Sequence, residues 1–132
     1  MNVFSLSLAS ALFLTLGPAL AQQEKQTPQL AETTMSAASF EAYASGTTLY
    51  FNRHGAPYGA EVYLEDRRVR WSFLDGECKD GVWYEDQGMI CFVYEDNATP
   101  QCWSFFRESN GLRAIFENDP NATTLYEAQQ ND

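Results

Sequence analysis

The sequence predicts a mainly β protein, an antiparallel meander of about seven or eight short strands that curls into a small barrel-like sheet, with one short N-terminal helix. Three observations support this fold class. Clusters of turn-forming residues recur at regular spacing after residue 46. The runs between them are rich in β-branched and aromatic residues and alternate with a period of two. Four consecutive runs are apolar on both faces, as expected of a sheet that closes into a barrel or is covered by the helix.

The N-terminal segment has the features of an export signal. Phe4–Leu16 is an uncharged run of apolar and small residues, Gly17-Pro18 interrupts it, and Ala19-Leu20-Ala21 is a small-x-small cleavage site. The run is shorter than the roughly 20 apolar residues of a membrane span. Gln22 is therefore the expected first residue of a mature exported protein.

One domain is expected to follow this signal. The predicted organisation is a signal peptide over 1–21, a flexible linker over 22–33, a single β-rich domain over 34–127 and a frayed tail over 128–132. The formal net charge of −10 argues against nucleic acids and anionic membranes as partners. We expect a monomer without metal or cofactor, whose partner is a protein or a small ligand.

The helix is predicted over Ser36–Ser45, with its first residue as the N-cap and Gly46 just after its end. Phe40, Tyr43 and Ala44 recur at helical spacing and therefore share one face. We expect this largely aromatic face to pack on the domain.

The strands begin after this helix. Thr47–Phe51 is the first, and the turn cluster Asn52–Pro57 ends it. Ala60–Leu64 and Arg68–Phe73 form the next pair. A two-residue turn at Glu65-Asp66 and one at Asp66-Arg67 predict the same faces. Either turn places one apolar set on a shared face, namely Val62, Leu64, Val69, Trp71 and Phe73.

The opposite face of this pair carries the candidate ligand-binding residues, Glu61, Tyr63, Arg68 and Arg70. A turn at Glu65-Asp66 sets Glu61 opposite Arg70. Inside a barrel, these side chains would bind an anionic or polar ligand, with arginine as a bidentate donor. On the surface, they would form a ladder of ion pairs that contributes little stability.

Two further hairpins follow. Gln87-Gly88 joins Val82–Asp86 to Met89–Tyr94 and sets Trp83 opposite Phe92. After a loop at Glu95–Pro100, the strand Gln101–Glu108 leads to a turn at Asn110-Gly111 that pairs Phe105 with Phe116. One face of these four strands is predicted to form a core wall of Trp83, Ile90, Phe92, Trp103, Phe105 and Phe116. The other face carries Val82, Tyr84, Cys91, Val93, Cys102 and Phe106.

Three cysteines, at positions 78, 91 and 102, allow three single-bridge pairings in an oxidising compartment. Cys91 and Cys102 lie on the same face of adjacent predicted strands, so this pair is the favoured disulfide. Cys78 lies among carboxylates, which disfavour a thiolate, and we expect it to be an inert free thiol.

Several short motifs follow one another along the chain: Gly46-Thr47-Thr48, Tyr58-Gly59-Ala60-Glu61-x-Tyr63, Arg67-Arg68-Val69-x-Trp71, Cys78-x-x-Gly81-x-Trp83, Ile90-Cys91-Phe92-x-Tyr94 and Cys102-Trp103. In this order, over about residues 36–117, they resemble a family of small exported proteins of unknown function found in alphaproteobacteria. The resemblance implies a periplasmic location and a small barrel-like fold. It brings no activity and no functional residues.

Recognisable catalytic patterns are missing from the sequence. His54 is the single histidine, and the carboxylates Asp75, Glu77 and Asp80 lack the spacing of a calcium loop. The favoured function is a non-enzymatic periplasmic module that binds a protein or a small polar ligand. One alternative is an inhibitor of a hydrolase that presents Asn52–Tyr58 or Glu95–Pro100 to an enzyme cleft. An enzyme is the weaker alternative.

Overall fold

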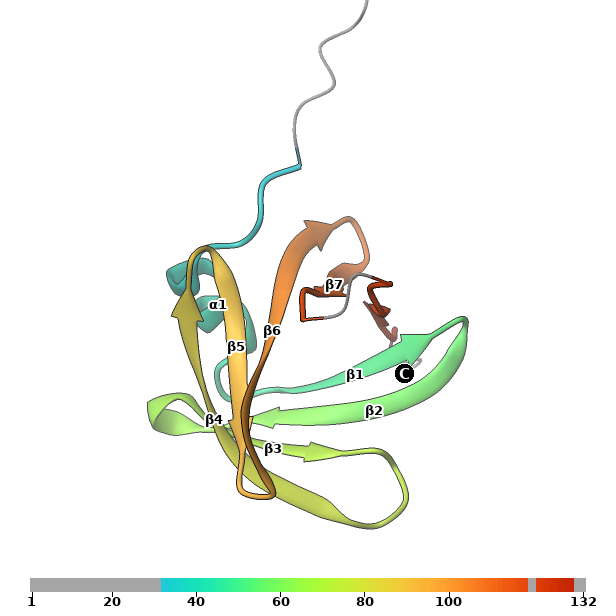
Figure 1. Cartoon of the computed structure of the whole chain (residues 1–132). Coiled ribbons are helices and arrows are strands. Elements are labelled where there is room, and N and C mark those ends of the chain that lie inside the picture. The colour runs from blue at the N-terminus through green and yellow to red at the C-terminus, as the bar shows by residue number, and fades with distance from the viewer. Residues whose placement is uncertain (1–31, 119–120, 130–132) are drawn as a thin grey trace, which may run out of the picture. The chain divides into compact units, whose positions relative to one another are not determined.

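The computed structural model describes residues 32–118 and 121–129. The predicted signal peptide, with its cleavage site before Gln22, and residues 22–31 of the predicted linker lie outside the described residues. The described residues form an eight-stranded closed barrel in which each strand pairs antiparallel with its neighbour in sequence and β8 pairs with β1 (Figure 1). The predicted fold class is therefore confirmed.

The elements in chain order are α1 (Ala37–Ala44), β1 (Thr48–Arg53), β2 (Ala56–Tyr63), the 3-10 turn η1 (Glu65–Arg67), β3 (Arg68–Ser72), β4 (Cys78–Asp86), β5 (Met89–Tyr94), β6 (Asn97–Glu108), β7 (Gly111–Phe116) and β8 (Thr124–Glu127). Among the described residues, no helix is both long and apolar enough to cross a membrane.

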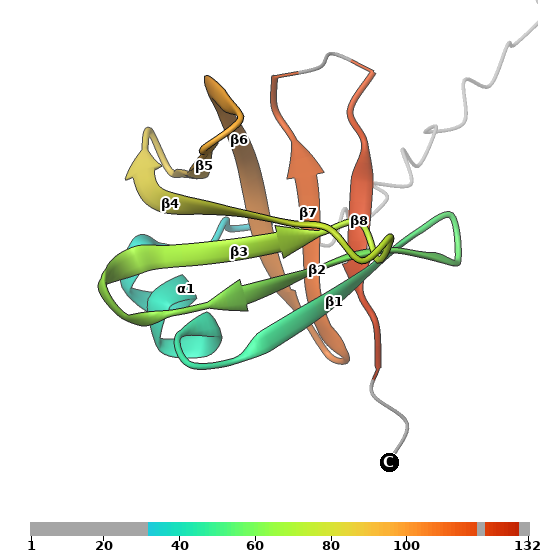
Figure 2. The same cartoon turned by 90° about the horizontal axis from the view of Figure 1, so that it is seen from below.

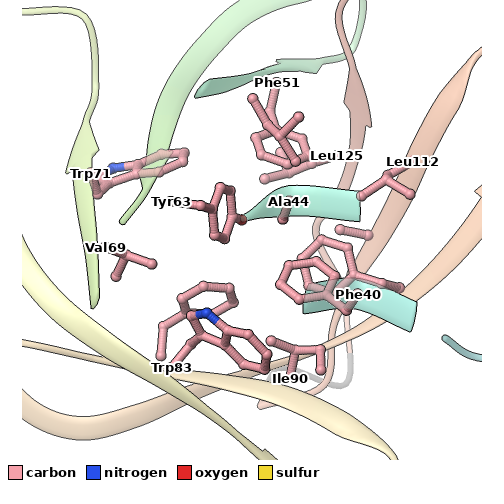
Figure 3. Packing of buried hydrophobic residues seen from close by; sticks show 14 of the residues in the cluster. Phe40, Ala44, Phe51, Tyr63, Val69, Trp71, Trp83, Ile90, Leu112 and Leu125 are labelled. Atoms are coloured by element: carbon pink, nitrogen blue, oxygen red, sulfur yellow. The ribbon is translucent and has the colours of Figure 1, made fainter. Parts of the chain in front are cut away.

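The helix α1 lies at one end of the barrel (Figure 2). Ser36 is its N-cap, as predicted, because the Ser36 side chain accepts a hydrogen bond from the Ser39 amide at 3.1 Å. The Phe40 ring lies inside the barrel, with its centroid 5.6 Å from that of Tyr63, 5.2 Å from that of Trp83 and 4.5 Å from that of Phe105 (Figure 3). Because α1 packs into this end, it leaves the outer surface of the sheet uncovered.

The middle strands are apolar on both faces, and only one of these faces lies inside the barrel. Their inner face forms the core, where Trp83, Ile90, Phe92 and Phe105 are buried as predicted. On the outer face, Val82 is 47% exposed and Tyr84 is 37% exposed. The second apolar face is thus partly open to solvent, so closure of the barrel explains the inner apolar face but not the outer one.

The predicted turn between β2 and β3 is wrong. Leu64–Arg67 lie between these strands, and because the Leu64 amide donates to the Arg68 carbonyl, the turn itself has three residues, Glu65–Arg67. Glu61 pairs with Trp71, and Tyr63 pairs with Val69. An odd number of connecting residues reverses which side chains share a face. Glu61 and Tyr63 therefore point into the barrel with the apolar residues of β3.

The extra residue in this connection is Arg67. Asp66 and Arg67 both have left-handed backbone angles, with φ of 56°. The guanidinium group of Arg67 pairs with Glu41 of α1 at 3.0 Å and lies 4.4 Å from the ring centre of Trp83. Contacts with the helix and with an indole ring thus hold a conformation for which the local sequence carries no glycine signal.

The other hairpins agree with the predictions to different degrees. Trp83 pairs with Phe92 as predicted. The predicted loop at Glu95–Pro100 is wrong, because β6 already begins at Asn97. The last turn is shifted so that Glu108 pairs with Gly111 and Phe116 pairs with Trp103 instead of Phe105. This shift of two residues changes partners but keeps each side chain on its predicted face.

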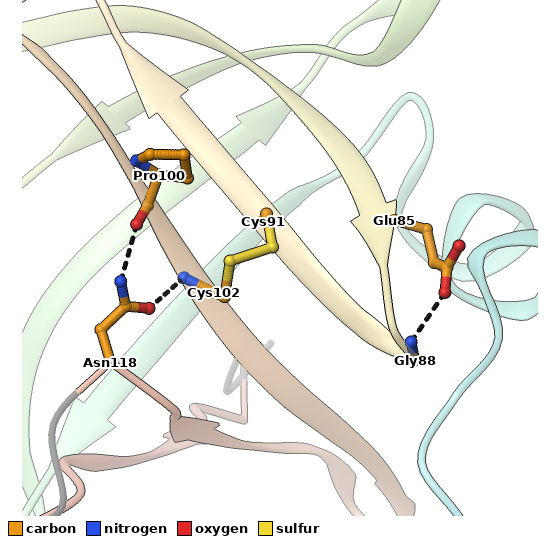
Figure 4. The surroundings of a disulfide bond; sticks show 6 residues. All are labelled: Glu85, Gly88, Cys91, Pro100, Cys102 and Asn118. Atoms are coloured by element: carbon orange, nitrogen blue, oxygen red, sulfur yellow. Dashed lines mark hydrogen bonds between the residues drawn. A yellow bond between two sulfur atoms is a disulfide. The ribbon is translucent and has the colours of Figure 1, made fainter.

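The predicted disulfide joins Cys91 of β5 to Cys102 of β6 (Figure 4). These residues lie directly opposite each other in the strand pair. Next to the bridge, the Asn118 side chain accepts from the Cys102 amide at 2.8 Å and donates to the Pro100 carbonyl at 2.8 Å. Cys78 is a free and exposed thiol.

Candidate functional site

Two glycines on the inner face of the barrel make room for large rings. A Cβ atom at Gly59 would lie 2.2 Å from the Trp71 ring, and one at Gly81 would lie 2.4 Å from the Val93 carbonyl and 2.8 Å from the Tyr94 ring. Close approach of this kind is the usual reason for glycine inside a strand. The indole of Trp71 and the phenol of Tyr94 can therefore lie against neighbouring strands.

The barrel interior is incompletely filled beyond the residues that pack on α1. A cavity of about 90 Å³ remains, and its floor includes Tyr63 and Phe105, two of the three rings that pack against Phe40. Its wall is mostly aromatic and contains Phe51, Tyr58, Trp71, Phe92, Tyr94 and Trp103. The half-exposed Phe73 also lines the cavity and marks its opening to solvent.

One carboxyl group lies in this aromatic wall. Glu61 is 1% exposed, and the Tyr94 hydroxyl lies 3.1 Å from each of its carboxyl oxygens. Burial raises the pKa of Glu61 to about 8, although the Tyr94 hydrogen bond and the Lys79 charge both act to lower it. The carboxyl group is therefore mostly protonated at neutral pH when the cavity is empty.

Lys79 lies at the mouth of the cavity. Its ammonium nitrogen is 4.9 Å from the Tyr94 ring centre, 5.5 Å from the Phe73 ring centre and 3.4 Å from Asp96 Oδ2. The Lys79 side chain is 22% exposed. An alkylammonium group is thus held at the mouth by two aromatic faces and one carboxylate.

An outer pocket of about 300 Å³ adjoins the mouth, because Trp71, Phe73 and Lys79 line both spaces. Acidic side chains make up most of its remaining lining, which contains Asp75, Glu77, Cys78, Glu95 and Asp96. The mouth therefore combines aromatic surface with a strongly negative rim.

The structure separates the four residues predicted to share a site. Glu61 and Tyr63 lie in the cavity wall, whereas Arg68 and Arg70 are exposed on the outside of the barrel. Arg70 pairs at 2.6 Å with Asp80 of β4 instead of with Glu61. The predicted convergence is wrong because the three-residue connection between β2 and β3 reverses one strand relative to the other.

Lys79, Tyr94 and Trp103 line the cavity but were not predicted as site residues from the sequence. One signal was present in the sequence, since Gly59 and Gly81 directly precede two predicted strands, at places where a Cβ atom would meet the Trp71 ring or the Tyr94 ring. Lys79 gave no signal, because an inward-facing lysine near the start of a strand looks like an ordinary surface residue.

The site offers hydrogen bonding, an ionisable carboxyl group and aromatic surface. Within residues 32–118 and 121–129, no three His, Cys, Asp or Glu side chains are placed to hold a metal ion. His54 lies in the exposed β1–β2 turn.

Comparisons of this chain with protein-family models, with curated proteins and with solved structures find no match.

Proposed function

We propose that this protein is a non-enzymatic periplasmic binding module that takes the polar head of a small ligand into its barrel. The observation that carries the proposal is the aromatic-lined cavity with one buried carboxyl group, Glu61. Small-molecule sites typically combine apolar and aromatic walls with a few well-placed polar groups. Eight-stranded barrels have an interior that side chains fill or that holds one small ligand.

The size of the cavity limits what can enter it. A dry protein cavity of about 150 Å³ is known to accept benzene. The interior space here is about 90 Å³, so it suits a head group smaller than an aromatic ring. The outer pocket of about 300 Å³ would hold the rest of the ligand.

Export to the periplasm is part of this proposal. The apolar run, the cleavage site before Gln22 and the family resemblance all favour it. The disulfide Cys91–Cys102 is compatible with an oxidising compartment. The hydrolase-inhibitor alternative has less support, because the segments Asn52–Tyr58 and Glu95–Pro100 consist mainly of strand residues on either side of short turns.

Side-chain NMR of the three tryptophans can test ligand binding. Trp71 and Trp103 line the cavity, whereas Trp83 packs on Phe40 and does not line it. Titration with 1-pentanol, pentylamine and pentanoate should give saturable shifts of the Trp71 and Trp103 indole N–H signals with at least one probe. The Trp83 signal should stay in place. If none of the three probes gives saturable shifts, the proposal is wrong.

A variant that fills the cavity provides the matched control. Ala114 is buried and lines the cavity, so Ala114→Leu should abolish the saturable shifts. Ala56 is exposed, and Ala56→Leu adds the same atoms outside the barrel. The Ala56→Leu variant should bind like the parent. Equal loss of binding in both variants would mean that the probes do not enter the cavity.

A further inference from the structure

The charges around the cavity favour one class of ligand. Glu61 lies inside, and four carboxylates, Asp75, Glu77, Glu95 and Asp96, surround the outer pocket. Among the residues that line the two spaces, Lys79 is the single cation. An anionic ligand would approach a protein of net charge −10 through this acidic rim. A cation would be attracted along the same path.

Lys79 shows how such a cation is held. Its side chain is a butylammonium group, and the ammonium nitrogen lies over the Tyr94 and Phe73 rings beside Asp96. Aromatic faces attract a cation, and they do so more strongly when water is excluded. The mouth therefore already stabilises an alkylammonium group that belongs to the protein.

Beyond Lys79, the cavity continues to Glu61. Among the described residues, the carboxyl group has one hydrogen-bond partner, the Tyr94 hydroxyl, and otherwise faces an aromatic wall. A buried carboxylate is costly unless a cation or several hydrogen-bond donors accompany it. An ammonium group in the cavity would supply both a positive charge and donors.

On the basis of the ligand-binding function proposed above, we propose that the ligand is a linear aliphatic diamine or polyamine. One ammonium group would lie in the inner cavity beside Glu61. The methylene chain would follow Trp71 and Phe73, which line both spaces. A second ammonium group would lie in the outer pocket among the rim carboxylates, and Lys79 would move out of the mouth on its flexible stem.

Proton release provides a specific signature of this arrangement. The ionisable groups that face Glu61 are Tyr63 on its own strand, Tyr94 on β5 and Lys79 on β4. Burial and the Glu61 charge raise the pKa of both tyrosines, so they stay protonated at neutral pH. An ammonium beside Glu61 favours the carboxylate, so binding at about pH 7 should release up to about one proton from that carboxyl group.

Calorimetric titration of the purified protein with 1,5-diaminopentane tests the inference. Pentylamine, 1-pentanol and pentanoate share the same five-carbon chain and serve as charge controls. The diamine should bind most tightly, pentylamine more weakly, and pentanoate not at all. Binding of the diamine should weaken with added salt, because the rim charges are exposed. Titration in two buffers of different ionisation enthalpy measures the released proton.

Two variants locate the ammonium group. Glu61→Gln keeps the shape of the side chain but removes its negative charge, so diamine affinity should fall by about tenfold or more and proton release should disappear. Lys79→Met removes the competing ammonium group, so diamine affinity should rise severalfold. The indole N–H spectrum of Trp83 confirms that both variants are folded.

The outcomes separate this inference from the proposed function. If 1-pentanol or pentanoate binds as tightly as the diamine, or if Glu61→Gln binds the diamine like the parent, the ligand is not an amine held by Glu61. The cavity would then still be a binding site. If no probe shifts the Trp71 and Trp103 signals, the inference and the proposed function both fail.

Discussion

Glu61→Gln should change how the stability of the barrel depends on pH. Glu61 is 1% exposed, and its pKa rises from 4.5 to about 8 on folding because burial disfavours its charge. When folding raises the pKa of a group, its contribution to stability is complete below the unfolded pKa and is lost as the pH rises through the folded pKa. The parent protein should therefore become less stable as the pH rises from 4.5 to about 8.

The size of this loss follows from the two pKa values. With 4.5 for the unfolded chain and about 8 for the folded protein, about 4 kcal/mol of unfolding free energy disappears between about pH 5 and about pH 9. Small domains typically have a total stability of about 5–15 kcal/mol, so the effect is large. Glutamine is uncharged throughout, so Glu61→Gln should lack this loss.

Urea denaturation of the parent and of Glu61→Gln at a series of pH values between these limits measures the effect. Among the described residues, the other carboxyl groups with shifted pKa values titrate outside this pH range. Arg67 and Arg70 lower the pKa values of Glu41 and Asp80, which therefore titrate below this range. The two proteins should have similar stability at the acid end and diverge toward the alkaline end. Parallel curves would refute the reasoning, because they would mean that the carboxylate is solvated or fully compensated in the folded state.

Three further substitutions test the fold. Phe40→Ala removes the ring that joins α1 to the barrel and should lower the unfolding free energy by about 3–5 kcal/mol, whereas a loss below about 1 kcal/mol would mean that the helix is not part of the core. Replacing both Cys91 and Cys102 with serine opens a loop of sequence separation 11 and should lower the unfolding free energy, measured by urea denaturation, by about 2–3 kcal/mol. Reductant should destabilise the parent but not the double variant; if it destabilised both equally, the loss would not come from this disulfide. Gly59→Ala places a Cβ atom 2.2 Å from the Trp71 ring, so it should lower stability by about 1–3 kcal/mol and shift the tryptophan emission; parental stability and emission would show that the indole does not lie there.

Local turn chemistry made the β4–β5 hairpin predictable. Gln87 and Gly88 both have positive φ angles, of 51° and 78°, as the favoured two-residue hairpin turn requires. Once that turn is placed, Trp83 must face Phe92, and both must share the inner face. The disulfide followed from the same logic. Because Cys91 is adjacent in sequence to the inward-facing Phe92, Cys91 must face outward, as its partner Cys102 does.

The β2–β3 hairpin was not predictable from local rules. The residues Glu65–Arg67 contain no glycine or asparagine, although two of them adopt left-handed backbone angles. What holds them is distant in sequence, because Arg67 pairs with Glu41 and lies over the Trp83 ring. Each of these contacts requires the assembled barrel. Tertiary contacts, and not a local turn signal, therefore accompany the register that places Glu61 on the inner face.

This placement of Glu61 gives one substitution two opposite expected effects. Burial in an aromatic wall makes the charged carboxylate costly, so removing the charge should stabilise the empty protein toward alkaline pH. The same low-dielectric surroundings strengthen the attraction between that carboxylate and an ammonium group, so removing the charge should weaken diamine binding. A purely structural carboxyl group would give the first effect without the second. Measuring stability and affinity on the same Glu61→Gln preparation therefore decides whether the buried carboxyl group is a binding residue of the cavity or a cost of the fold alone.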